Sequence, residues 1–229
     1  MKTLINIIVA PSQAFEALRE QPTWLVAFLV TALLCLAAQF IMLPATLHAF
    51  AAWYPSTLGR DPRTAGMTPE ERQAALNVAL GFVRFGGIVS ALTCVLAALV
   101  TGLVLWLAAA GRGVASFSRM FALAMNVAVV WYGLGQLVNA AIVVARGPAS
   151  FSAPWQVTLA MPSLAWVAGG APTRLLGFLM GLNPFSMWSL VLLAAGTVAI
   201  ARIPAAFAYG AAALITLGSC ALFAFAAQP

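Results

Sequence analysis

The sequence predicts an all-α, polytopic membrane protein that forms one domain over residues 1–229. Hydrophobic residues make up 63% of the chain and charged residues 7%, whereas soluble domains have about 45–50% and about 25%. Apolar segments close to the length that a helix needs to cross about 30 Å of hydrocarbon recur along the chain. In lipid a helix satisfies its backbone hydrogen bonds internally, so we expect helices and not an open sheet.

The segment before the first span has the pattern of a short amphipathic helix. In PSQAFEALREQP, residues 11–22, Pro11 suits a first helical turn and Ser12 is a candidate cap. Phe15 and Leu18 share one face, and Pro22 ends the helix. We expect this helix to lie along the membrane interface.

Five segments are predicted to span the membrane as helices. Together with the interfacial helix they account for most of the apolar sequence. Their approximate bounds are residues 24–43, 88–110, 120–144, 185–201 and 205–225.

The connection between the first two spans contains a helix start. Thr68 has the position of an N-cap, Pro69 of the first helical residue and Glu71 of the partner in a capping box. A helix is therefore expected from Pro69. Gly81 and the pair Gly86 and Gly87 are expected to bend this helix between a surface part and the second span; the alternative is one straight helix.

The connection between the third and fourth spans is apolar but is interrupted by Pro154 and Pro162. These prolines lie too close together for a regular spanning helix. We predict an interfacial loop over residues 151–168 that places Trp155 and Trp166 among the headgroups. The alternative is a re-entrant hairpin.

The Asn-Pro pair before the fourth span predicts a helix start at a membrane boundary. Asn183 is the expected cap and Pro184 the first helical residue. Trp188 then lies one turn into the helix, at interface depth, and Trp24 marks the corresponding boundary of the first span.

Small residues at four-residue spacing predict close helix packing. Gly177 and Gly181 form a GxxxG pattern, and Ala206, Gly210 and Gly218 follow the same spacing in the last span. Such residues let two helices approach closely. We expect self-association through these faces, although the spacing also arises by chance in sequences rich in alanine and glycine.

Acidic, basic and histidine side chains are absent from the predicted spans. All the acidic residues lie outside them, His48 is the single histidine, and the cysteines Cys35, Cys94 and Cys220 lie in separate apolar runs. Relays, metal sites and acid–base catalysis need such groups. We therefore expect no catalytic residue, no metal and no cofactor.

The polar groups that do fall within the membrane are concentrated in the third span. Within regular α-helix the last three members of the set share one face. We interpret the set as bonds between helices; the alternative is a polar groove for a lipid headgroup or a prenyl-linked peptide. The set is Asn126, Tyr132, Gln136 and Asn139.

Several segments together resemble the Yip1-domain family. These segments are APSQAFEALREQPTW, GRGVASFSRMFALA between the second and third spans, and LNPFSMWSLVLLAAG in the fourth. The resemblance implies five spans and, for eukaryotic members, association with prenylated Rab GTPases in ER and Golgi membranes. The third span lacks the proline common in the family, and the long cytosolic N-terminal region of eukaryotic members is missing; short forms resemble bacterial ones.

We therefore expect a non-enzymatic scaffold of the bacterial inner membrane, with the N-terminus cytoplasmic and the C-terminus periplasmic. Its expected partners are membrane lipids, other membrane proteins or a second copy. The 11 basic residues are scattered, so nucleic acid is not expected. The alternative is a permease or transporter component that uses the polar face of the third span.

Overall fold

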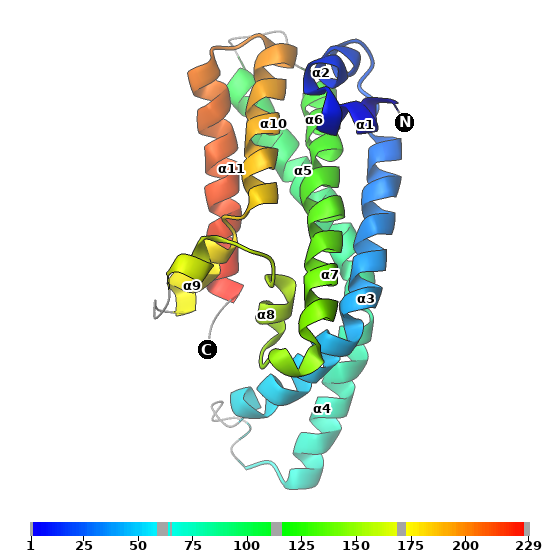
Figure 1. Cartoon of the computed structure of the whole chain (residues 1–229), viewed down its shortest axis with the longest axis vertical. Coiled ribbons are helices and arrows are strands. Elements are labelled where there is room, and N and C mark those ends of the chain that lie inside the picture. Colours follow the sequence, from blue (N-terminus) through cyan, green and yellow to red (C-terminus); the bar gives the residue numbers. More distant parts are fainter. Residues whose placement is uncertain (1, 59–63, 65, 111–115, 169–172, 227–229) are drawn as a thin grey trace.

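The computed structural model describes residues 2–58, 64, 66–110, 116–168 and 173–226. Every regular element in these residues is a helix, so the predicted all-α class is confirmed. Figure 1 shows long helices packed side by side, with the N-terminal helices α1 (Lys2–Val9) and α2 (Pro11–Glu20) across one end.

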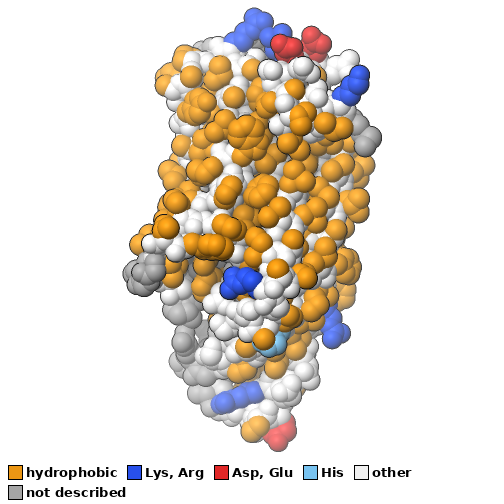
Figure 2. Space-filling model, viewed as in Figure 1, with side chains coloured by type: hydrophobic (Ala, Val, Ile, Leu, Met, Phe, Trp, Pro, Cys, Tyr) orange, Lys and Arg blue, Asp and Glu red, His pale blue; other side chains and the backbone are white. Residues whose placement is uncertain are grey.

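Within the described residues, five helical segments are long and apolar enough to cross a membrane. Hydrophobic side chains cover most of the visible face, and charged side chains lie mainly toward its two ends (Figure 2). The segments are α3 (Leu25–Leu58), α5 (Gly86–Ala109), the third span Phe117–Arg146, α10 (Pro184–Ala201) and α11 (Ala205–Ala226).

Helix α3 is much longer than the predicted first span, because it continues through Pro44 and Pro55 to Leu58. The prediction that the helix ends near Leu43 was wrong. Proline removes one backbone donor, but helices beside lipid can continue through it, and α3 does so at both positions. At 1.5 Å per residue the 34 residues extend about 51 Å, well beyond the hydrocarbon core.

Helix α4 (Pro69–Arg84) begins at the predicted capping box. Thr68 N donates to Glu71 Oε2 at 2.8 Å, and Glu71 N donates to Thr68 Oγ1 at 3.3 Å. The helix ends before Phe85 and α5 begins at Gly86, so the predicted break is confirmed. Helix α4 packs against α3, and in Figure 1 the two form a hairpin at the end opposite α1.

The N-terminal helix is confirmed over Pro11–Glu20, but its surroundings differ from the prediction. Phe15 and Leu18 are buried in the largest core cluster, where α2 packs against α6 (Phe117–Ala128) and α10. The apolar face of α2 is therefore covered by protein and not by lipid. Ser12 does not cap the helix, because Ala10 holds the N-cap position without a side-chain bond.

Residues 148–168 form no spanning helix, which agrees with the prediction of a loop, and part of the segment packs against the bundle; its place at the membrane interface stays a prediction. They form the helical turn Pro148–Ser150, helix α8 (Pro154–Thr158) and the turn Leu164–Val167. Phe151 and Val157 are buried in a core cluster with residues of α3 and of α7 (Gln136–Arg146). Burial by protein is what makes such irregular backbone tolerable beside lipid.

The predicted start of α10 is confirmed in detail. Asn183 Oδ1 accepts from Phe185 N and Ser186 N, both at 3.1 Å, and Asn183 N donates to Ser186 Oγ at 3.0 Å. Asn183 is buried. The reciprocal bonds of this capping box satisfy backbone donors that the first helical turn leaves free.

The small residues separate into an inner and an outer set. Gly177 and Gly181 are buried where α9 (Thr173–Met180) and the turn after it pack against α11. A Cβ on Gly181 would lie 2.7 Å from Cys220 Sγ, so this GxxxG pattern serves packing within the chain. Gly210 and Gly218 are exposed and have no neighbour for an added Cβ within 4 Å.

A different row of small residues on α11 faces the bundle, and it was not predicted from the sequence. Its members recur every four residues, and all are buried. The predicted set with the same spacing, Ala206, Gly210 and Gly218, lies on the exposed face. The inner stripe is Ala208, Ala212, Thr216 and Cys220.

Candidate functional site

The third span is interrupted by a π-helix over Val129–Gly135, between α6 and α7. The sequence predicts a regular α-helix over these residues, and the structure differs from that prediction. A π-helix changes the pairing of backbone groups and often marks functional sites. Cys35 Sγ on α3 donates to Tyr132 O within the π-helix at 2.9 Å, which supplies a side-chain partner where the regular pairing is altered.

Asn139 on α7 is fully buried and bonded on both sides of its amide. Nδ2 donates to Val157 O at 2.9 Å and to Thr158 O at 3.2 Å, and Oδ1 accepts from Met161 N at 3.0 Å. Nδ2 also lies 3.3 Å from Met42 Sδ on α3. This single side chain therefore fastens the segment around α8 to the bundle.

Asn126 on α6 is also buried and bonded to backbone. Its Nδ2 donates to Thr23 O at 2.9 Å, just before α3, and to Ala122 O of its own helix at 2.8 Å. The bond to Thr23 joins two segments that are far apart in the sequence. Both asparagines thus bond mainly to backbone outside the other spanning helices, whereas the prediction was of bonds between those helices.

Tyr132 and Gln136 have different surroundings. Tyr132 lines a cavity between helices, whereas Gln136 is half-buried and its Oε1 is buried with no hydrogen-bond partner. The prediction that Tyr132, Gln136 and Asn139 share one face assumed regular α-helix. With the π-helix in place, Asn139 contacts α3 and the α8 segment, while Tyr132 lies at the cavity.

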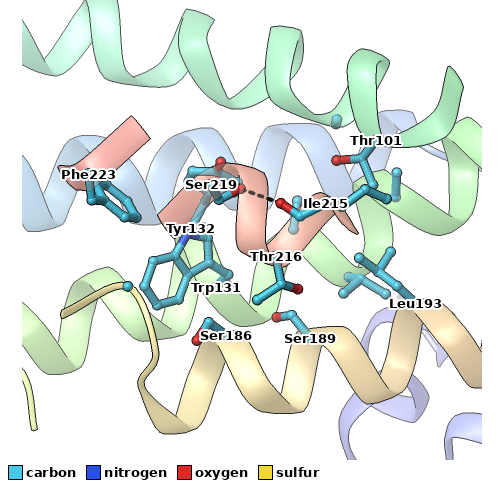
Figure 3. Close-up of a pocket in the computed structure, with 15 residues that line it drawn as sticks. Thr101, Trp131, Tyr132, Ser186, Ser189, Leu193, Ile215, Thr216, Ser219 and Phe223 are labelled. Carbon is cyan, nitrogen blue, oxygen red and sulfur yellow. Dashed lines mark hydrogen bonds between the residues drawn. The ribbon is translucent and has the colours of Figure 1, made fainter. Parts of the chain in front are cut away.

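The cavity lies inside the bundle and measures about 80 Å³. It is half-open and is bounded by α5, α6, the π-helix, α10 and α11. Figure 3 shows Ser189 on α10 facing Thr216 on α11, with Ser186, Ser219 and Trp131 nearby. Its hydroxyl-bearing residues are Thr101, Tyr132, Ser186, Ser189, Thr216 and Ser219.

Most of the serine and threonine protons in the cavity are used by the helices themselves. Ser186 Oγ donates to Asn183 O at 2.9 Å, Thr216 Oγ1 to Ala212 O at 3.0 Å, and Ser219 Oγ to Ile215 O at 3.0 Å. Ser189 differs, because its buried Oγ has no partner. Of the four serine and threonine hydroxyls on α10 and α11, Ser189 alone is buried without a partner.

Sequence reasoning missed this cavity, although a signal was present. Ser186 and Ser189 are three residues apart in α10, and Thr216 and Ser219 are three apart in α11. Residues three apart lie on one face of a helix. Two consecutive spans with the same hydroxyl spacing can place four hydroxyls opposite one another, provided that the helices pack with those faces together.

Comparison with known proteins places the chain in a family. Over 198 residues it is 30% identical to "Membrane protein YknW" of Bacillus subtilis (strain 168), an alignment that covers 85% of this chain and 76% of that protein. The chain belongs to the YknW family. No family model and no solved structure matches it.

The predicted tryptophan anchors of this YknW-family protein differ in exposure. Trp24 is exposed, with its ring 5.4 Å from that of Phe121, and Trp188 is also exposed. Trp166 is 63% exposed, whereas Trp155 is half-buried in the packed segment. Their position relative to lipid stays a prediction.

Charged groups take no part in the cavity of this YknW-family protein, since none of its lining residues is acidic or basic. The three cysteines are free and buried. Among the described residues, no group of three His, Cys, Asp or Glu could hold a metal ion. The lining offers hydroxyl groups for hydrogen bonding among apolar side chains.

Proposed function

We propose that the protein is a non-enzymatic scaffold of the Yip1-like type. It organises the membrane or binds partner membrane proteins, and it also associates with a second copy of itself. The proposal follows the family resemblance in the sequence and the relation to a membrane protein of Bacillus subtilis. It assigns the chain no catalytic residue and no cofactor.

The observation that carries the proposal is the outer face of α11. Gly210 and Gly218 are exposed there, and no atom lies within 4 Å of a Cβ added at either. Beside them is an apolar groove between the end of α5 and the start of α11, lined by residues that include Leu107, Ala206 and Gly210. Small residues on an open face allow a second helix to approach closely within lipid.

A second copy of the chain is the occupant we propose for this face, and bulk at the two glycines should prevent its approach. We expect wild-type protein in mild detergent to give dimers in native mass spectrometry. The double variant Gly210→Leu with Gly218→Leu should be monomeric. Its thermal stability should stay unchanged, because both positions are exposed and a Cβ added at either has no neighbour within 4 Å.

The matched control is Ala141→Leu on α7, which adds bulk at another exposed position and should leave dimers intact. Wild-type protein that is monomeric in native membranes after cross-linking would contradict self-association. Dimers that persist in the double variant would place the interface elsewhere and remove the support given by α11.

We also propose a place in the bacterial inner, or cell, membrane with the N-terminus in the cytoplasm. Charge does not decide this orientation among the described residues. The two ends of the bundle carry equal numbers of basic residues. One end has Lys2, Arg19, Arg119 and Arg202, and the other has Arg72, Arg84, Arg146 and Arg174. The family resemblance and the short link before Arg119 favour the N-terminal end, since short loops weigh most.

A permease or transporter component is the second candidate, favoured by the hydroxyl-lined cavity to which four helical spans contribute. One observation opposes a transport role. Asn126 and Asn139 form hydrogen bonds within the protein, so the polar face of the third span offers no continuous path. Transport would instead have to use the cavity itself.

A further inference from the structure

We propose that the cavity between α5, the π-helix, α10 and α11 binds the hydroxylated headgroup of an uncharged, single-chain lipid of the monoacylglycerol class. This inference concerns the interior of the bundle and does not depend on self-association through the outer face of α11.

The first argument is an unsatisfied group. Ser189 Oγ lies in the cavity lining, has no hydrogen-bond partner, and belongs to a residue that is only 8% exposed. A serine in a helix can donate to the carbonyl one turn earlier, as Thr216 and Ser219 do. Because a buried polar group without a partner is costly, a ligand that bonds Ser189 gains what the free protein lacks.

The second argument is the balance of donors and acceptors. Ser186, Thr216 and Ser219 each donate their proton to backbone, so their oxygens can act only as acceptors toward a ligand. Ser189 alone among these four has an uncommitted proton. A ligand hydroxyl both donates and accepts, so it can bond these oxygens and Ser189 together.

The same balance disfavours an anion. A phosphate or carboxylate would meet several lone pairs and no basic side chain, and burying an unpaired charge is expensive. The walls that complete the cavity are apolar, among them Val127, Leu193 and Phe223. An uncharged headgroup on an apolar body suits this lining.

Size and access set the remaining limits. About 80 Å³ holds a few water molecules or a small polar group, since about 10–15 Å³ by this measure suffices for one water. A whole lipid does not fit. The cavity is not fully enclosed, so we place the headgroup inside it and the acyl chain outside.

The test uses the full-length protein in mild detergent with 1-monooleoylglycerol as the probe. Binding is followed by thermal unfolding and by native mass spectrometry, and a photoreactive analogue locates the site. We expect a rise in Tm that depends on probe concentration, with labelling on α10 or α11. Oleoyl-lysophosphatidic acid, which adds a phosphate to the same glycerol and tail, should bind at least ten-fold more weakly.

Two variants separate binding from folding. Ser189→Ala should bind the probe about two- to ten-fold more weakly, the equivalent of one hydrogen bond, while its Tm without the probe stays the same or rises. Ser189→Leu, which fills the cavity, should abolish binding. The matched control is Thr197→Val, which removes a buried hydroxyl from α10 outside the cavity and should bind normally.

The proposal would be overturned if wild type and Ser189→Ala bound 1-monooleoylglycerol with equal affinity. It would also be overturned if the photoreactive analogue labelled only exposed surfaces, for example at Phe82 or Leu92. Equal affinity for the phosphate-bearing lipid would show that the cavity does not select an uncharged headgroup, and would overturn it as well.

Discussion

Asn139 gives the sharpest test of how this protein holds its irregular segment in place. Replacing it with Leu keeps the side chain close in size but removes the bonds to Val157 O, Thr158 O and Met161 N. The site is fully buried, so water cannot replace them. The segment around α8 should then separate from α7 more easily than in the wild type.

The size of the effect follows from the groups affected. Two lost hydrogen bonds contribute about 0.5–1.5 kcal/mol each, and the stranded Met161 N–H adds about 1–3 kcal/mol. Bonds between membrane helices average about 0.6 kcal/mol, so the lower part of the range is appropriate. We expect a loss of about 2–4 kcal/mol in the free energy of unfolding on these grounds.

The assay is thermal unfolding in mild detergent, together with hydrogen–deuterium exchange of residues 151–161. The matched control is Gln136→Leu on the same helix, where the buried Oε1 has no partner to lose. That variant should be as stable as the wild type or more stable. Equal destabilisation by the two changes, or unchanged exchange over residues 151–161 in Asn139→Leu, would refute the reasoning.

Three further predictions follow from particular contacts. Gly181→Leu should lower the free energy of unfolding by about 1–3 kcal/mol, because its Cβ would lie 2.7 Å from Cys220 Sγ, whereas Gly218→Ala, with open space, should cost nothing in the same thermal assay. Asn183→Ala should cost about 0.5–2 kcal/mol by loss of the cap, and Asn183→Ser should restore most of it; equal melting of the two would contradict the role. A fluorescent reporter active only in the cytoplasm and fused after Pro229 should stay dark, because five spans follow a cytoplasmic start; a bright fusion would reverse the orientation.

Local chemistry explains which elements could be predicted. The starts of α4 and α10 follow from Thr68 with Glu71 and from Asn183 with Pro184, since a cap acts on backbone within three residues of itself. The break at Phe85 follows from the adjacent glycines. In each case the residues that decide the structure are neighbours in the sequence.

Residues that depend on distant partners were predicted less well. Pro44 lies within α3 and does not end it, and the apolar face of α2 is covered by α6 and α10. Asn139 was expected to link helices, but its main partners belong to the segment around α8. Small residues on α11 gave two stripes with the same spacing, and only packing decides which of them faces inward.

By itself, the sequence determined that this chain is a bundle of membrane-spanning helices, because the length and apolarity of a segment are properties of that segment alone. It also determined where two of the helices begin. Only the tertiary structure decided that Ser189 stays without a partner among hydroxyls from α10 and α11, and that Asn139 fastens a buried segment. Burial and pairing depend on groups that are far apart in the chain, and the packing of helices alone brings such groups together.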